Sequence, residues 1–148
     1  MRTPLRSAVW LATAVALAAC ATPPVPPPNL LAPTEEQAAL RAMQTRTFDV
    51  SDRTQAMRGV IAALQDLGFI IERANEQLGL VTAARFAEPN YNDMVGVTVI
   101  ARPQGADKME IRVNAIYDNK PITDANIYQN FFATLERSLF VGRTEAAQ

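Results

Sequence analysis

The spacing of apolar residues changes along the chain, and each pattern predicts a different element. Residues 53–67 carry apolar side chains three and four positions apart, at Met57, Val60, Ile61, Leu64 and Leu67. This spacing predicts an amphipathic helix. Ser51 or Asp52 can cap its start, and Gly68 is placed to end it with a positive φ angle.

Apolar and polar residues alternate around and after this helix, which predicts β-strands with one buried and one solvated face. Short strands are expected over residues 47–50, 69–73 and 80–86. The two longer strands have core-facing positions at Val95, Val97, Val99, Ala101, Met109, Ile111, Val113, Ala115 and Tyr117. Glu110, Arg112 and Asn114 point to the solvated face. Residues 118–121, Asp-Asn-Lys-Pro, are expected to end the sheet.

A wide apolar stripe predicts a last helix that is capped by Thr123 or Asp124 and ends at Gly142. The stripe consists of Ile127, Tyr128, Phe131, Phe132, Leu135, Leu139 and Phe140. A short helix is also expected after Thr34, where Gln37 completes a capping box. The order β-α-β-β-β-β-α, with two helices on one face of an antiparallel sheet, predicts an α+β two-layer sandwich.

Composition along the chain suggests four segments. Residues 1–19 form a signal peptide, with Arg2 and Arg6 ahead of a short apolar run. Residues 20–45 hold six prolines between Pro23 and Pro33, which favour an extended spacer of about 3.1 Å per residue, and then the short helix. Residues 46–142 are the globular domain, and residues 143–148 are a tail.

The only cysteine, Cys20, follows Leu17, Ala18 and Ala19. Leu-Ala-Ala-Cys resembles a bacterial lipobox, which implies lipid attachment to Cys20 and cleavage just before it. Two or more acyl chains give a stable membrane anchor where one does not. The alternatives are a plain signal peptide with an incidental cysteine, or an uncleaved anchor.

The residues after Cys20 and the net charge indicate which membrane we expect the protein to be attached to, and by what means. Ala21 and Thr22 follow the cysteine rather than an aspartate, so we expect an outer-membrane lipoprotein that faces the periplasm. The formal net charge is −1, and loss of Arg2 and Arg6 with the signal peptide makes it −3. Such a charge does not indicate nucleic acid or an anionic membrane surface as a partner. We therefore expect the membrane to be reached through the lipid alone.

The residue inventory argues against most catalytic chemistry. The chain has no histidine and one cysteine, which excludes Cys/His zinc sites and histidine-based triads. No phosphate-binding glycine loop and no Gly-x-Ser-x-Gly motif occurs. We expect no enzyme activity, no metal and no cofactor, although a carboxylate-based hydrolase remains a minor alternative.

Candidate contact residues lie in the loop after residue 87 and on the solvated sheet face. The loop carries Tyr91, Asn92 and Asp93, and the sheet face carries Arg112. A solvated loop and a solvated strand explain the same residues without any partner. We treat these four residues as possible partner-binding positions.

Several short segments resemble small uncharacterised proteobacterial lipoproteins. They are Arg46-Thr47-Phe48-Asp49, Leu64-Gln65-Asp66-Leu67-Gly68-Phe69, Leu78-Gly79-Leu80 with Thr82-Ala83, and Tyr128-Gln129-Asn130-Phe131-Phe132 with Ser138-Leu139-Phe140. The element order is also similar to the helix-grip domains of the lipoprotein C subunit of the outer-membrane β-barrel assembly machinery. This likeness is one of architecture and implies no activity.

The leading functional hypothesis is a non-enzymatic envelope lipoprotein that binds a protein partner as an interaction or assembly-accessory module. The alternative is a periplasmic carrier of a lipid or another hydrophobic ligand, held in a groove between the sheet and the last helix.

Overall fold

The computed structural model describes residues 32–87 and 93–146. Its elements are α1 (Glu35–Gln44), β1 (Thr45–Phe48), α2 (Arg53–Asp66), β2 (Ile70–Asn75), β3 (Leu80–Phe86), β4 (Met94–Gln104), β5 (Lys108–Tyr117), β6 (Lys120–Pro121) and α3 (Ala125–Ala146). The strands form one antiparallel sheet in the order β1-β5-β4-β3-β2, and β6 also pairs with β5. The predicted α+β two-layer sandwich is confirmed.

Each described helix begins at a side chain that accepts a backbone N–H bond. Thr34 and Gln37 form the predicted capping box of α1. Asp52 accepts from the N–H two residues ahead at 3.0 Å, and Asp124 does the same at 2.9 Å. Of the predicted alternatives, the aspartates rather than the preceding Ser or Thr therefore cap α2 and α3. Gly68 follows α2 with a φ of 79°, as predicted.

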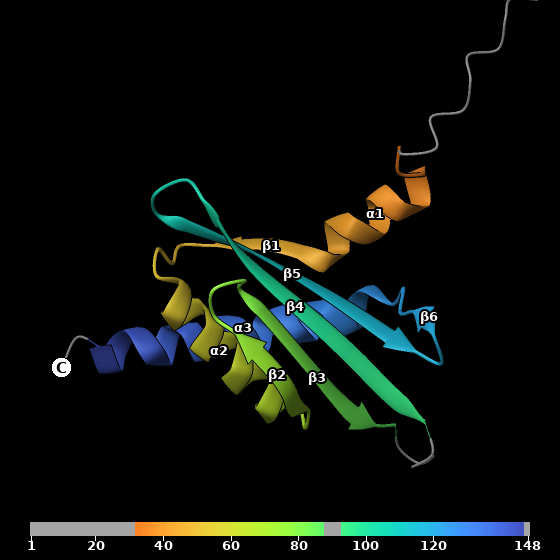
Figure 1. Cartoon of the computed structure of the whole chain (residues 1–148). Helices are drawn as coiled ribbons and strands as arrows, with labels where there is room; N and C mark the ends of the chain where they lie inside the picture. Colours follow the sequence, from red (N-terminus) through yellow and green to blue (C-terminus); the bar gives the residue numbers. More distant parts are fainter. Residues whose placement is uncertain (1–31, 88–92, 147–148) are drawn as a thin grey trace, which may run out of the picture. The chain divides into compact units, whose positions relative to one another are not determined.

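The core lies between one face of the sheet and the helices α2 and α3, with α3 crossing behind the strands (Figure 1). The predicted core-facing residues Val97, Val99, Ala101, Met109, Ile111, Val113 and Ala115 are buried. Tyr117 was expected among them but is 40% exposed, because it lies at the end of β5. The helices approach closely at Gly59, where an added Cβ would lie 2.5 Å from Leu139 Cδ2.

The segment after β5 does not end the sheet, contrary to the sequence-based expectation. Asp118 and Asn119 have φ angles of 48° and 57°, the positive pair that a two-residue type I′ hairpin turn requires. The chain then returns as β6, whose Pro121 pairs with Ile116. Proline is tolerated there because β6 is an edge strand.

The segments that flank the predicted domain belong to its helices. The compact unit begins at Pro33, earlier than the boundary expected at Arg46, and α1 contacts β1, β5 and α3. At the other end, α3 continues past Gly142 to Ala146, since a glycine inside a helix costs only about 1 kcal/mol relative to alanine. Among the described helices, none is long and apolar enough to cross a membrane.

Candidate functional site

Two of the five residues singled out from the sequence can be placed in the structure. Cys20, Tyr91 and Asn92 lie outside the described residues. Asp93 and Arg112 are described, but the fold does not bring them together. Asp93 is next to Tyr117, the last residue of β5. Arg112 lies five residues before Tyr117 on the same strand, which separates the two by about 17 Å at 3.4 Å per residue.

Asp93 closes the end of the sheet. Its carboxylate accepts a 2.8 Å hydrogen bond from the Tyr117 hydroxyl, and its carbonyl accepts a 2.8 Å bond from the N–H of Ala87. The bond to Asp93 raises the pKa of the Tyr117 hydroxyl, since the carboxylate stabilises the protonated phenol. The backbone bond joins the two ends of the segment that carries Tyr91 and Asn92, and the Tyr117 bond ties one of those ends to β5.

Arg112 lies on the sheet face opposite the helices, which we call the open face. Its Nε donates a 3.2 Å bond to Thr45 Oγ1, and Thr45 is the residue directly opposite it on β1. Glu110 and Asn114 share this face, in agreement with the alternation in the sequence. Arg112 thus helps to hold β1 on β5 and presents the rest of its guanidinium on the open face.

The register brings apolar residues from two neighbouring cross-strand rows together at one end of the open face. Ile70, Ala84, Gly96 and Ile116 lie directly opposite one another across β2, β3, β4 and β5. Phe86 and Met94 face each other in the adjoining position. We call Ile70, Phe86, Met94 and Ile116 the open-face patch; their side chains are 68%, 53%, 53% and 41% exposed.

The shape of the open-face patch follows from the small residues at its centre. Ala84 and Gly96 supply little or no side chain between Ile70 and Ile116. An added Cβ on Gly96 would lie 3.2 Å from Ile116 Cγ1, so Ile116 leans over the glycine. The result is a shallow apolar surface on a hydrogen-bonded sheet, of the kind that marks interaction sites on soluble domains.

A different apolar space lies on the other side of the sheet. A cavity of about 170 Å³ is enclosed by β3, β4 and β5 on one side and by α2 and α3 on the other. Its inner wall includes the buried residues Leu64, Val97, Val113, Ala115 and Phe131. A groove between the sheet and the last helix was expected only under the carrier hypothesis.

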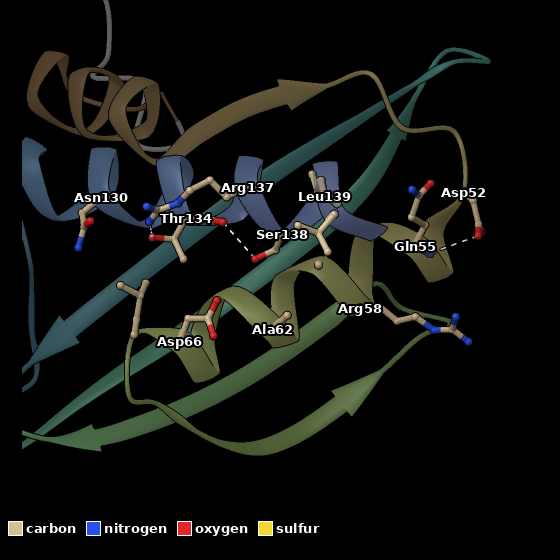
Figure 2. Close-up of a pocket in the computed structure, with 13 residues that line it drawn as sticks. Asp52, Gln55, Arg58, Ala62, Asp66, Asn130, Thr134, Arg137, Ser138 and Leu139 are labelled. Carbon is tan, nitrogen blue, oxygen red and sulfur yellow. Dashed lines mark hydrogen bonds between the residues drawn. The ribbon is translucent and has the colours of Figure 1, made fainter. Parts of the chain in front are cut away.

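A second hollow, of about 1000 Å³, runs between α2 and α3 (Figure 2). Asp52, Arg58 and Asp66 line it from the α2 side, and Arg137 lines it from α3. Positive and negative side chains therefore alternate along it, and this mixture does not select a ligand of one charge.

The hydroxyl groups of Thr134 and Ser138, which line this hollow, form hydrogen bonds within α3. Ser138 Oγ donates to the carbonyl oxygen of Thr134 at 3.1 Å, and Arg137 donates to Thr134 Oγ1 at 3.0 Å (Figure 2). A serine nucleophile needs an adjacent base instead. Among residues 32–87 and 93–146, no group of three or more His, Cys, Asp or Glu is arranged to hold a metal ion.

No family model matches the chain. No curated protein matches it. Among solved structures, it is similar to the adenylate sensor from AMP-activated protein kinase, crystallised in complex with 5-aminoimidazole-4-carboxamide 1-beta-D-ribofuranotide (ZMP). The TM-score is 0.46 at 13% sequence identity, over 64% of this chain and 94% of that one. A likeness of this size carries no argument about function.

Proposed function

We propose that this protein is a non-enzymatic lipoprotein of the cell envelope, anchored through Cys20 at the outer membrane and facing the periplasm, where it binds a protein partner. The open-face patch is the observation that carries this proposal. Four exposed apolar side chains on one hydrogen-bonded surface favour association, because burying apolar area is the dominant favourable term in most protein–protein binding.

The charges beside the patch favour a particular kind of partner. Arg73 pairs with Thr82, in the cross-strand row next to the one that holds Ile70 and Ala84. Arg112 lies on the same face, in the row after that of Arg73. The chain as a whole is slightly acidic, with a net charge of −1. Glu110 on this face lies directly opposite Arg102, so Arg73 and Arg112 keep the face basic, and a partner surface with apolar side chains bordered by acidic residues is complementary to it.

A crosslinking pull-down from native membranes tests the proposal. The informative chain carries Ile70→Ser and Phe86→Ser together, and its matched control carries Leu78→Ser. Leu78 is 66% exposed and lies in the turn between β2 and β3, outside the patch. We expect the specific partner to be lost from the double variant and kept by the control.

Two further chains separate the anchor from the surface. Cys20→Ala removes the site of lipid attachment, and we expect it to lower recovery of a membrane partner while leaving the open-face patch intact. Arg112→Ala tests the charged part of the open face. Equal recovery of the partner by the wild type and by the Ile70/Phe86 double variant contradicts the proposed surface.

A further inference from the structure

We propose that the cavity between the sheet and the helices α2 and α3 binds the end of a single alkyl chain that carries an anionic head group. This site lies on the opposite side of the sheet from the open-face patch, so the inference goes beyond the proposed partner binding. A free fatty acid is the simplest ligand with this chemistry.

The cavity is lined by buried residues and by exposed ones. Val97, Val113, Ala115 and Phe131 are at least 94% buried and form the inner wall. Ile127, which is 45% exposed, lies among the lining residues of the outer part. A chain can therefore enter from solvent and place its terminal carbons against the sheet.

The hydroxyl of the buried lining residue Tyr128 already has hydrogen-bond partners. Tyr128 lines the cavity and is 1% exposed. Its hydroxyl donates to the carbonyl oxygen of Ile122 and accepts from Gln44. The buried wall named above carries no polar side chain, so its apolar surface favours an apolar ligand over water.

The volume limits the ligand to a short apolar segment. An engineered cavity of about 150 Å³ binds benzene, and this cavity measures about 170 Å³. It therefore accommodates about six carbon atoms. A complete two-chain lipid does not fit, whereas the end of one alkyl chain does.

Arg85 supplies the preference for a negative head group. It lines the cavity from β3, is exposed, and has its guanidinium 5.1 Å from the centre of the Phe69 ring. One of its nitrogens donates to the carbonyl of Leu67 at 3.2 Å, and a guanidinium has five N–H donors in all. Within the described part of the chain, no carboxylate forms an ion pair with Arg85.

Titration calorimetry with a series of fatty acids tests the size of the site. The full chain carrying Cys20→Ala is purified without detergent and titrated with butanoate, hexanoate, octanoate and decanoate below their micelle concentrations. We expect affinity to rise about fourfold for each methylene that enters the cavity. The rise should stop once about six carbons are inside.

Decanol and an arginine variant test the head group. We expect decanol to bind about tenfold more weakly than decanoate, and Arg85→Gln to remove this difference while Arg85→Lys keeps most of it. Arg102→Gln is the matched control, because Arg102 lies on β4 and faces the open side of the sheet. Equal binding of decanol and decanoate by the wild type would overturn the anionic assignment.

Two filling variants locate the binding. Ala115→Leu fills space at the buried wall, and Ile122→Phe enlarges a partly buried side chain of the lining. We expect either change to abolish binding, with folding checked by thermal melting. Binding that survives in a folded filling variant, or the absence of any binding to the wild type, would overturn the site. The Ile70/Phe86 double variant should bind decanoate normally, which separates this test from that of the partner surface.

Discussion

Gln44 and Tyr128 are joined by a 3.2 Å hydrogen bond from Nε2 to the hydroxyl oxygen, although 84 residues separate them. The same Nε2 donates to Asn114 Oδ1 at 3.2 Å, and the Tyr128 hydroxyl donates to the Ile122 carbonyl. Gln44 is 5% exposed and Tyr128 is 1% exposed. One hydrogen-bond network, buried at Gln44 and Tyr128, thus connects the end of α1, the middle of β5 and the start of α3.

Removing the Tyr128 hydroxyl should destabilise the fold. Tyr128→Phe leaves the Ile122 carbonyl and one Gln44 donor without this partner, and an unsatisfied buried polar group costs about 1–3 kcal/mol. Urea unfolding of the wild type, Tyr128→Phe, Gln44→Leu and the double variant measures the coupling. We expect the two single effects to be non-additive, and simple additivity would contradict a shared network.

Gly79 should be the least replaceable of the turn glycines. Its φ is 64°, and an added Cβ would lie 2.2 Å from the carbonyl oxygen of Ala101. Gly105 has a similar φ of 74° with open space around it, so it is the matched control. We expect Gly105→Ala to cost about 1–2 kcal/mol from backbone strain alone and Gly79→Ala to cost clearly more, measured by chemical denaturation. Equal losses would show that the contact with Ala101 is relieved at no cost.

The hydrogen bond between Tyr117 and Asp93 should make the free energy of unfolding decrease at alkaline pH. The pKa of Tyr117 is raised above its usual 10.0, mainly by this hydrogen bond. A group whose pKa is higher in the folded state contributes stability that is fully present below pH 10.0 and is lost as the pH rises through the folded pKa.

Absorbance titration of the three tyrosines, of which Tyr117 is one, measures this shift. Tyr117→Phe identifies the titration that belongs to Tyr117, and Asp93→Asn should return the pKa of that group toward 10.0. A titration curve unchanged by Asp93→Asn would contradict the assignment.

A glycine at the second position of the turn, in place of Asn119, should stabilise the hairpin between β5 and β6. Asn119 holds a φ of 57°, and Asn-Gly or Asp-Gly is the preferred pair for a type I′ turn. We expect Asn119→Gly to raise the melting temperature slightly and Asn119→Val to lower it, since a β-branched residue is strained at positive φ. Thermal unfolding followed by circular dichroism compares the two variants. A higher melting temperature for the valine variant would exclude a type I′ turn.

The parts of the fold that were predictable from the sequence depend on neighbours along the chain. The caps at Thr34, Asp52 and Asp124 and the C-terminal glycine Gly68 follow local hydrogen-bonding and φ requirements, so short motifs reveal them. The alternation in β4 and β5 also fixes which side chains face the helices. The hairpin before β6 was missed because Pro121 reads as a strand breaker, although proline is acceptable on an edge strand.

The candidate surfaces depend on contacts between distant segments. Ala84, Phe86, Met94 and Gly96 stand at alternate positions of β3 and β4, and their apolar character on the open face was a usable signal in the sequence. Register is needed to show that Ile70 and Ile116 complete the row. The cavity is harder still to predict, because its volume depends on how side chains from five elements pack.

The junction between α1 and β1 has a mechanical consequence. Gln44 ends the helix and Thr45 begins the strand, with no residue between them to supply slack. If the chain is anchored at its amino-terminal side and held by a partner on the open face, tension enters the sheet at the pairing of Thr45 with Arg112. Such a pull acts first on the contacts of α1 with α3 and on the buried side chain of Gln44, and only then on the pairing of β1 with β5.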